Sequence, residues 1–294
     1  MSFMEVFMII IYIILILYLI ALIATINLYF VAWYDYVNFR ASRPDSGEWR
    51  QSTHTGRMLF CVFLESLALF FHVITQPLRY LFDRMPPKQV SDSRLPILLV
   101  HGWGSGSHAF MLISWYLKRK KFKNIYTMTY RPVMADLEWL SQKLADRINE
   151  VLKETGAAKI NIVAHSLGGV LARYAIKNLY MEDKVSRLIA IGSPHRGSRV
   201  AALWPYGRNT LQLLYKSDFI KTLEEGGLTP GQVKYVSIYS AFDNFIIPQE
   251  SANLGDSAVN HQLSYHGHLR LLYSHKVNRL VREALEAGDA PAKH

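Results

Sequence analysis

Short apolar runs alternate with longer amphipathic segments over the last two thirds of the chain. Apolar runs of this length are typical of strands buried on both faces of a sheet, and the amphipathic segments are typical of the helices that cover it. The pattern predicts an α/β domain with a mostly parallel sheet and helices on both faces. We expect strands at residues 97–100, 125–130, 160–164, 188–191, 234–239 and 262–265, and helices at 109–120, 136–154, 168–179 and 274–286.

The beginning of the chain has a different pattern, because residues 6–34 are almost continuously apolar and carry no charge. The run is longer than the about 20 residues that a helix needs to cross a bilayer. We expect a transmembrane helix and not a cleaved signal peptide, since no Lys or Arg precedes the run and no small-residue cleavage site follows it. Trp33, Tyr34 and Tyr36 at its end suit the headgroup layer.

A second apolar stretch at residues 58–75 contains Glu65 and His72. A carboxylate at the bilayer centre costs about 2.5–3.5 kcal/mol, so the sequence is compatible with an interfacial helix and with a second span. Four arginines follow the first span, at Arg40, Arg43, Arg50 and Arg57. The positive-inside rule keeps that flank in the cytoplasm, so the domain that follows is cytoplasmic with one span and exported with two.

These patterns divide the chain into a membrane anchor at residues 1–90 and an α/β domain at residues 91–294. A linker rich in Pro, Ser and charge, at residues 84–96, joins them. The formal net charge is +10, and residues 1–39 hold two acidic and no basic side chains, so the remainder carries +12. Such an excess suits anionic lipid headgroups better than nucleic acid, because the basic cluster "KRKKFK" at 118–123 falls where a helix C-terminus is expected. The single cysteine, Cys61, excludes an intrachain disulfide and a Cys-based metal cluster.

The predicted strand at 160–164 runs through "AHSLGG" directly into a predicted helix. A strand that enters a helix through x-x-S-x-G is typical of a nucleophile elbow, a turn so sharp that small residues must stand two before and two after the serine. Ala164 and Gly168 occupy those positions here. Ser166 is therefore a candidate nucleophile, and the alternative is a small residue at an ordinary tight turn.

Acyl transfer also needs backbone N–H donors for an oxyanion, and the loop "HGWG" after the strand at 97–100 can supply one. The donors would be the N–H groups of Trp103 and Leu167. The same loop fits G-x-G-x-x-A at 104–109, a dinucleotide-binding fingerprint. That alternative expects an acidic residue after the next strand, where Arg131 stands, and it leaves the elbow unexplained.

An acid and a base follow Ser166 along the chain in the order Ser, Asp/Glu, His that accompanies such an elbow. Asp243 comes after the strand at 234–239, and His266 and His268 come after the strand at 262–265. Asp256 is the other candidate acid, but it lies well past the end of the strand at 234–239. His261 precedes the last predicted strand and His275 lies inside the helix that follows it, so both are expected to be structural or solvated.

Five stretches together resemble the small bacterial triacylglycerol lipases and esterases of the α/β-hydrolase superfamily: "HGWGSG", "AHSLGG", "SPHRGS", "DNFIIP" and "GHLRLLYS". The resemblance runs from about residue 95 to the C-terminal helix, and Ala164, where Gly is usual, is its one departure within a motif. In this family the acid opens a D-x-x-[IV]-x-P segment and the histidine lies in G-H-x-x-L, which match Asp243 and His268 and leave His266 as second choice.

The resemblance implies an α/β-hydrolase fold and a serine carboxylic-ester hydrolase. Its catalytic triad would be Ser166, His268 and Asp243, with an acyl-enzyme intermediate and an oxyanion hole at Trp103 and Leu167. This chemistry needs no cofactor and no metal.

Residues 199–232 form a predicted cap or lid, with Leu211, Leu214, Tyr215 and Phe219 on one helical face. That face suits either an acyl-binding wall or a surface helix packed on the core. Together with the membrane anchor, this face favours a lipid-like ester, such as a phospholipid, as the substrate. The protein would then act at a membrane, which in a bacterium is the inner membrane. Two alternatives stay open: an acyltransferase with the same triad, and an inactive scaffold, which predicts a missing triad member although none is missing. The oligomeric state is also left open.

Overall fold

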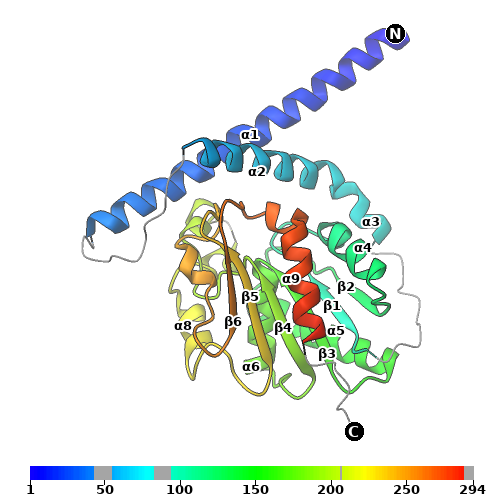
Figure 1. Cartoon of the computed structure of the whole chain (residues 1–294), viewed down its shortest axis with the longest axis vertical. Coiled ribbons are helices and arrows are strands. Elements are labelled where there is room, and N and C mark those ends of the chain that lie inside the picture. The colour runs from blue at the N-terminus through cyan, green and yellow to red at the C-terminus, as the bar shows by residue number, and fades with distance from the viewer. Residues whose placement is uncertain (43–54, 83–93, 206, 288–294) are drawn as a thin grey trace.

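The structure is a computed structural model that describes residues 1–42, 55–82, 94–205 and 207–287. Six parallel strands form one sheet in the order β2-β1-β3-β4-β5-β6 (Figure 1). The strands are β1 Ile97–Val100, β2 Ile125–Met128, β3 Ile160–His165, β4 Val185–Ile191, β5 Lys234–Ser240 and β6 Val259–Leu263. The expected α/β class and parallel sheet are confirmed.

Helices cover both faces of the sheet because side chains alternate along each buried strand. In β1, Leu98 and Val100 belong to the apolar core under α5 (Leu137–Thr155) and α6 (Leu167–Asn178). Ile97 and Leu99 belong to the core on the opposite face, under α4 (Met111–Arg119) and α9 (His275–Glu286). Shorter helices lie before β1, at η1 Gln76–Leu78 and α3 Arg79–Phe82, and between the later elements, at η2 Ser107–Phe110, η4 Gln249–Ala252 and η5 Arg270–Tyr273.

The last strand is β6 at Val259–Leu263, so the expectation of a strand at 262–265 is wrong. Its sequence, "VNHQL", contains no apolar run, and of its side chains only that of Leu263 is buried. Pairing with β5 at the edge of the sheet defines this strand instead, from Val236 with Val259 to Ser240 with Leu263. His261 therefore lies within a strand and does not precede it.

The predicted cap at 199–232 is broken into η3 Arg199–Leu203, α7 Arg208–Gln212 and α8 Asp218–Glu224. The expected single helical face is wrong, because the Ser217 hydroxyl accepts a hydrogen bond from the Ile220 amide (3.3 Å) and begins a new helix there. As a result Leu211 is exposed, while Phe219 stacks on Tyr174 with 5.2 Å between ring centroids.

Two long apolar helices precede the sheet: α1 (Phe3–Ser42) and α2 (Thr55–Thr75), each longer than the sequence pattern predicts. Both lie across the edge of the sheet where the strands end, and the N-terminal half of α1 projects beyond the rest of the molecule (Figure 1). By length and composition, Phe3–Asn38 and Gly56–Leu78 are each able to cross a membrane. The predicted boundary at residue 90 and most of the linker at 84–96 lie outside the described residues.

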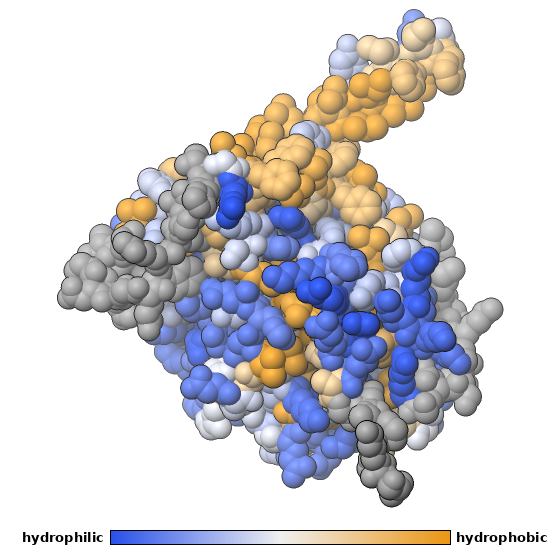
Figure 2. Space-filling view, viewed as in Figure 1, coloured by the Kyte–Doolittle hydropathy of each residue, from blue (hydrophilic) through white to orange (hydrophobic). Residues whose placement is uncertain are grey.

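The two halves of α1 have different surroundings. Its buried positions begin at Ala21 and repeat at helical spacing through Thr25, Leu28, Tyr29 and Ala32. Before Ala21, none of its side chains is buried and nearly all are apolar, which gives the orange rod of Figure 2. The packing of α1 against α2 begins at Tyr18, whose ring meets that of Phe70 edge to face with 5.8 Å between centroids, and the buried positions of α1 all lie from Ala21 onward.

Candidate functional site

Ser166 lies at the turn between β3 and α6 with φ 54° and ψ −125°, an unfavourable backbone conformation for a residue with a side chain. Such a conformation costs about 1–3 kcal/mol and persists only where the surroundings enforce it. Here the Ser166 amide donates to the Ile191 carbonyl (2.9 Å), and the Ser166 carbonyl accepts from the Gly169 amide (3.1 Å). The turn is therefore held on both sides, as a nucleophile elbow requires.

Close packing explains the small residues around this turn. A Cβ on Gly168 would lie 2.4 Å from the Val100 carbonyl oxygen, and a Cβ on Gly169 would lie 2.2 Å from the Ser193 hydroxyl oxygen. Ala164 is buried in β3, in register with Val100 of β1 and with an alanine of β4. Its methyl group therefore fits where the family pattern has glycine.

Asp243 and His268 form a buried pair at the ends of β5 and β6. The Nδ1 atom of His268 lies 2.9 Å from Oδ2 of Asp243, and both side chains are at most 4 % exposed. The other carboxylate oxygen, Oδ1, accepts hydrogen bonds from the amides of Phe245 (2.8 Å) and Ile246 (2.9 Å). This arrangement fixes the carboxylate and places the Nδ1 proton between the two side chains.

The charge of Asp243 also changes the proton affinity of the imidazole. Burial alone would lower the pKa of His268, but the charge of Asp243, the hydrogen bond to it and the charge of Glu65 outweigh burial and raise this pKa above its usual value. Burial, with the nearby His268, instead holds the pKa of His165 well below its usual range, so His165 is neutral. Protonation in this cluster is therefore directed to His268.

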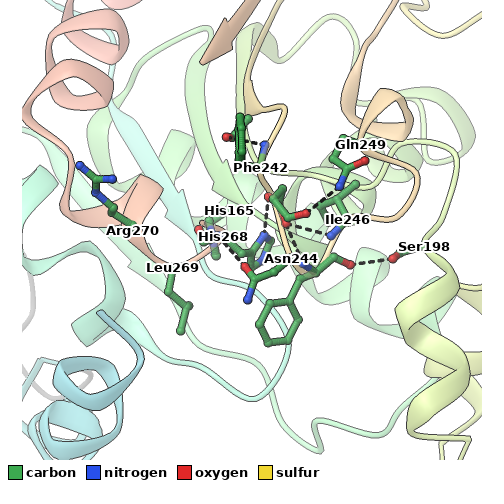
Figure 3. Close-up of polar contacts among 12 residues, drawn as sticks. His165, Ser198, Phe242, Asn244, Ile246, Gln249, His268, Leu269 and Arg270 are labelled. Atoms are coloured by element: carbon green, nitrogen blue, oxygen red, sulfur yellow. Dashed lines mark hydrogen bonds and ion pairs between the residues drawn. The ribbon is translucent and has the colours of Figure 1, made fainter. Parts of the chain in front are cut away.

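The backbone of His268 is held by two further side chains (Figure 3). Its amide donates to Oδ1 of Asn244 (3.1 Å), and its carbonyl oxygen lies 3.3 Å from Nε2 of His165. Ser198, from the "SPHRGS" stretch, donates to the Phe245 carbonyl (2.6 Å) and accepts from the Ile247 amide (3.1 Å), which ties that stretch to the loop of Asp243. The sequence pattern predicted none of these supporting contacts. The only signal for any of them was the position of Asn244 directly after Asp243.

The loop after β1 lies directly against the elbow. A Cβ on Gly102 would approach the Cβ of Ser166 to 2.8 Å. Among the residues that the structure describes, neither the Trp103 amide nor the Leu167 amide has a hydrogen-bond acceptor. Leu167 is the first residue of α6, where the amide has no partner within the helix and the helix dipole is positive. Both amides are available to an oxyanion.

Ser166 and His268 line one cavity of about 350 Å³, within the range of small-molecule sites. Its walls are mainly apolar and come from separate parts of the chain. Leu69 and Val73 belong to α2, whereas Val200, Ala201, Trp204 and Leu213 belong to the segment at 199–232. The predicted cap thus contributes a wall, though not as the continuous helix expected.

The other candidate residues lie elsewhere. The two ring nitrogens of His266 contact the Ser264 carbonyl (2.8 Å) and the Ser274 hydroxyl (3.1 Å), and His266 does not line the cavity. His275 is the first residue of α9, and Asp256 lies in a turn before β6. Within the described ranges no group of three His, Cys, Asp or Glu side chains is placed to hold a metal ion.

Comparisons with known proteins find a lipase family and individual lipases. The profile of the family described as Lipase (class 2) matches residues 94–280, well over half of the chain. A triacylglycerol lipase of Pseudarthrobacter phenanthrenivorans is 29% identical over 116 residues, 37% of this chain and 36% of that protein. One from Vibrio cholerae is 29% identical over 155 residues, 51% of this chain and 46% of that protein. The chain thus matches less than half the length of these relatives.

Solved structures share the fold. Aspergillus fumigatus lipase B matches with a TM-score of 0.62 at 22% identity, over 69% of this chain and 55% of the other. The mature form of Bacillus licheniformis lipase BlEst2 matches with a TM-score of 0.57 at 19% identity, over 68% of this chain and 96% of the other. At these identities the likeness establishes the fold, an α/β-hydrolase fold with a six-stranded parallel sheet.

Proposed function

Because the chain belongs to the class 2 lipase family, we propose that it is a membrane-anchored serine carboxylic-ester hydrolase with Ser166, His268 and Asp243 as its catalytic triad. One observation carries the proposal: Ser166 on its strained elbow and His268, which is paired with the buried Asp243, face the same apolar cavity. The three residues come from the ends of different strands, and the parallel sheet brings those ends to one edge.

The first half of the reaction forms an acyl-enzyme. Nε2 of His268 takes the hydroxyl proton of Ser166 while Oγ attacks the ester carbonyl carbon. The electron pair of the carbonyl moves to its oxygen, and the N–H groups of Trp103 and Leu167 donate hydrogen bonds to that oxyanion. When the tetrahedral intermediate collapses, His268 gives its proton to the leaving alcohol. Water then attacks the acyl-enzyme by the same steps and releases the acid.

Asp243 serves this cycle in two ways. Its Oδ2 accepts the Nδ1–H bond of His268, so Nε2 stays unprotonated and able to take the serine proton. Its negative charge then stabilises the imidazolium that forms. The two backbone amides bound to Oδ1 keep the carboxylate in the orientation that both roles need.

A lipid-like ester is the substrate class that the surroundings favour. The cavity is lined by Leu69, Val73, Val200, Trp204 and Leu213, which suit an acyl chain and offer no charge to a polar substrate. Leu69 and Val73 of the apolar helix α2, which packs against α1, form one of its walls, so a substrate dissolved in a bilayer would be close to the elbow.

We assign one membrane span, the first half of α1. The exposed apolar side chains of that half need lipid, whereas α2 turns the buried polar residues Glu65, Ser66 and His72 inward. Because these polar side chains are buried against the domain, we assign α2 to the surface of the bilayer and not to its interior. With one span, the arginines after it place the α/β domain on the cytoplasmic side.

Turnover of a p-nitrophenyl ester by full-length protein tests the function. Ser166→Ala is expected to lower kcat by about 10⁶-fold, by analogy with other serine hydrolases. Retention of wild-type turnover by the folded variant would exclude Ser166 as the nucleophile. Product analysis with a defined phospholipid identifies the acyl acceptor. Transfer to water releases a free acid, as expected of a hydrolase, whereas transfer to an alcohol forms a new ester, as expected of an acyltransferase.

A further inference from the structure

Helix α2 lies before the family segment at 94–280, yet one face of it is built into the catalytic site. The buried positions on that face repeat at helical spacing: Cys61, Glu65, Ala68, His72 and Thr75. A lipid-facing helix would carry apolar side chains there, but this face carries a carboxylate and an imidazole. Their partners therefore explain what the helix does.

Glu65 is 1 % exposed and binds the segment that carries His268. Its Oε1 accepts from the Leu269 amide and its Oε2 from the Arg270 amide, each at 2.9 Å. A Cβ on Gly267 would lie 2.3 Å from both Cδ and Oε2 of Glu65, so the backbone before His268 also packs against the carboxylate. Residues 267–270 wrap around a side chain that stands more than two hundred positions earlier in the chain.

These contacts complete a set of restraints around one residue. Asn244 binds the amide of His268, His165 lies against its carbonyl, and Asp243 binds its Nδ1 atom. Glu65 then fixes the next two amides, at the entry to η5 (Arg270–Tyr273). Burial raises the pKa of Glu65 to about 7, and the hydrogen bonds from the two backbone N–H groups act against that rise because they favour the ionised carboxylate.

Helix α2 and the short helix η1 after it also contact the loop after β1. Nε2 of Gln76, in the turn after α2, donates to the carbonyl of Gly104 (3.0 Å) in the loop that presents the Trp103 amide. Nε2 of His72 lies 3.2 Å from the Ser105 hydroxyl in that loop, and its Nδ1 lies 3.1 Å from the Tyr273 hydroxyl at the end of η5. One helix thus sets the histidine segment and the oxyanion loop relative to each other.

We propose that Glu65 is a positioning residue, which holds His268 in register with Ser166 through the amides of Leu269 and Arg270. The inference rests on the proposed function, because it assigns Glu65 a role through the catalytic base. It makes the membrane-proximal helix a component of the active site and not only an attachment. Glu65 touches no reacting atom, so its loss acts on kcat and leaves the cavity walls that bind the substrate in place.

The test compares full-length variants in detergent with a short-chain p-nitrophenyl ester. Glu65→Gln replaces one accepting oxygen by an N–H donor facing a backbone N–H, so one of the two bonds is lost. We expect kcat to fall about 10- to 100-fold, as for a catalytic group displaced by about 1 Å, with KM changed less than about 2-fold. Ser66→Ala is the matched control, since Ser66 is the next buried residue but contacts Tyr18 of α1 (3.3 Å) and not the histidine segment. It should change neither constant more than about 2-fold.

Gly267→Ala gives a second approach if Glu65→Gln does not fold. Its methyl group displaces the carboxylate while leaving it in the chain, and it should lower kcat with KM retained. A folded variant of either kind whose kcat stays within about 2-fold of wild type would overturn the inference, as would a loss confined to KM. Ser166→Ala, measured in parallel, separates the two levels: turnover by Ser166→Ala refutes the proposed function. An inactive Ser166→Ala beside a fully active Glu65→Gln refutes only the role of Glu65.

Discussion

Replacing Asp243 by Asn probes how the site controls the proton of His268. The side chain keeps its size, but one of its two accepting oxygens becomes an NH₂ donor, while the N–H donors around it occupy two positions. Oδ1 accepts from the Phe245 and Ile246 amides, and Oδ2 accepts from Nδ1 of His268. The single oxygen of the introduced asparagine cannot satisfy both.

The cost of each orientation sets the size of the effect. With its oxygen on the two amides, the asparagine side chain points its NH₂ at Nδ1 and moves the proton of His268 to Nε2, where it blocks proton transfer from Ser166. Turning the oxygen toward Nδ1 restores the tautomer but leaves both buried amides unpaired, at about 1–3 kcal/mol each. The total of about 2–6 kcal/mol corresponds to a kcat loss between about 30-fold and about 2×10⁴-fold.

Turnover of a p-nitrophenyl ester, with circular dichroism to confirm folding, measures this loss. KM should change little, because Asp243 does not line the cavity. Asp243→Ala is the companion variant, since it removes the acceptors from both amides and from His268 together. A folded Asp243→Asn protein with kcat within about 3-fold of wild type would refute the proposed role of Asp243 as the orienting acid.

Three further predictions concern the pH profile, a glycine beside the triad and the number of membrane spans. His268 acts as a base only when it is neutral, and Asp243 raises its pKa above the usual value of about 6.5, so kcat/KM should rise with pH through a midpoint above that value. Asp243→Asn should shift the midpoint downward, and a wild-type midpoint below the usual value would contradict the prediction. Gly192→Ala should lower both the melting temperature and kcat, because the added Cβ would lie 2.9 Å from Leu271 and 3.3 Å from Asp243 and His268. The left-handed backbone of Gly192, with φ +52°, alone costs about 1–2 kcal/mol for a residue with a side chain. An unchanged melting temperature and unchanged turnover would contradict this packing. In bacterial cells, a C-terminal fluorescent protein should be bright and a C-terminal alkaline phosphatase inactive if α1 spans once, and the reverse result would require a second span.

The central strands and the elbow were predictable because their signals are local. The residues of β1 are four consecutive apolar residues buried on both faces, and Gly168 must be small because a carbonyl lies within 2.4 Å of where its Cβ would stand. The edge strand β6 was placed wrongly because pairing with β5 defines it and hydrophobicity does not. The cap was misread because the Ser217 capping bond outweighs the apolar periodicity.

Glu65 shows what the sequence cannot convey. Within its own helix it is only a costly charge in an apolar stretch, and its two partners lie more than two hundred residues later. The choice of His268 over His266 depended likewise on the family pattern, because both follow the same strand within a few residues. Their different hydrogen-bond partners exist only in the folded chain.

Labelling of the intact protein with a fluorophosphonate tests the central claim most directly, because that reagent phosphonylates a serine only where a base activates it and an oxyanion hole receives the product. Mass spectrometry of full-length protein in detergent should show one adduct per chain, located on Ser166, and none in Ser166→Ala. A folded wild-type protein that stays unlabelled, or an adduct that persists in Ser166→Ala, would contradict the assignment of Ser166 as the nucleophile.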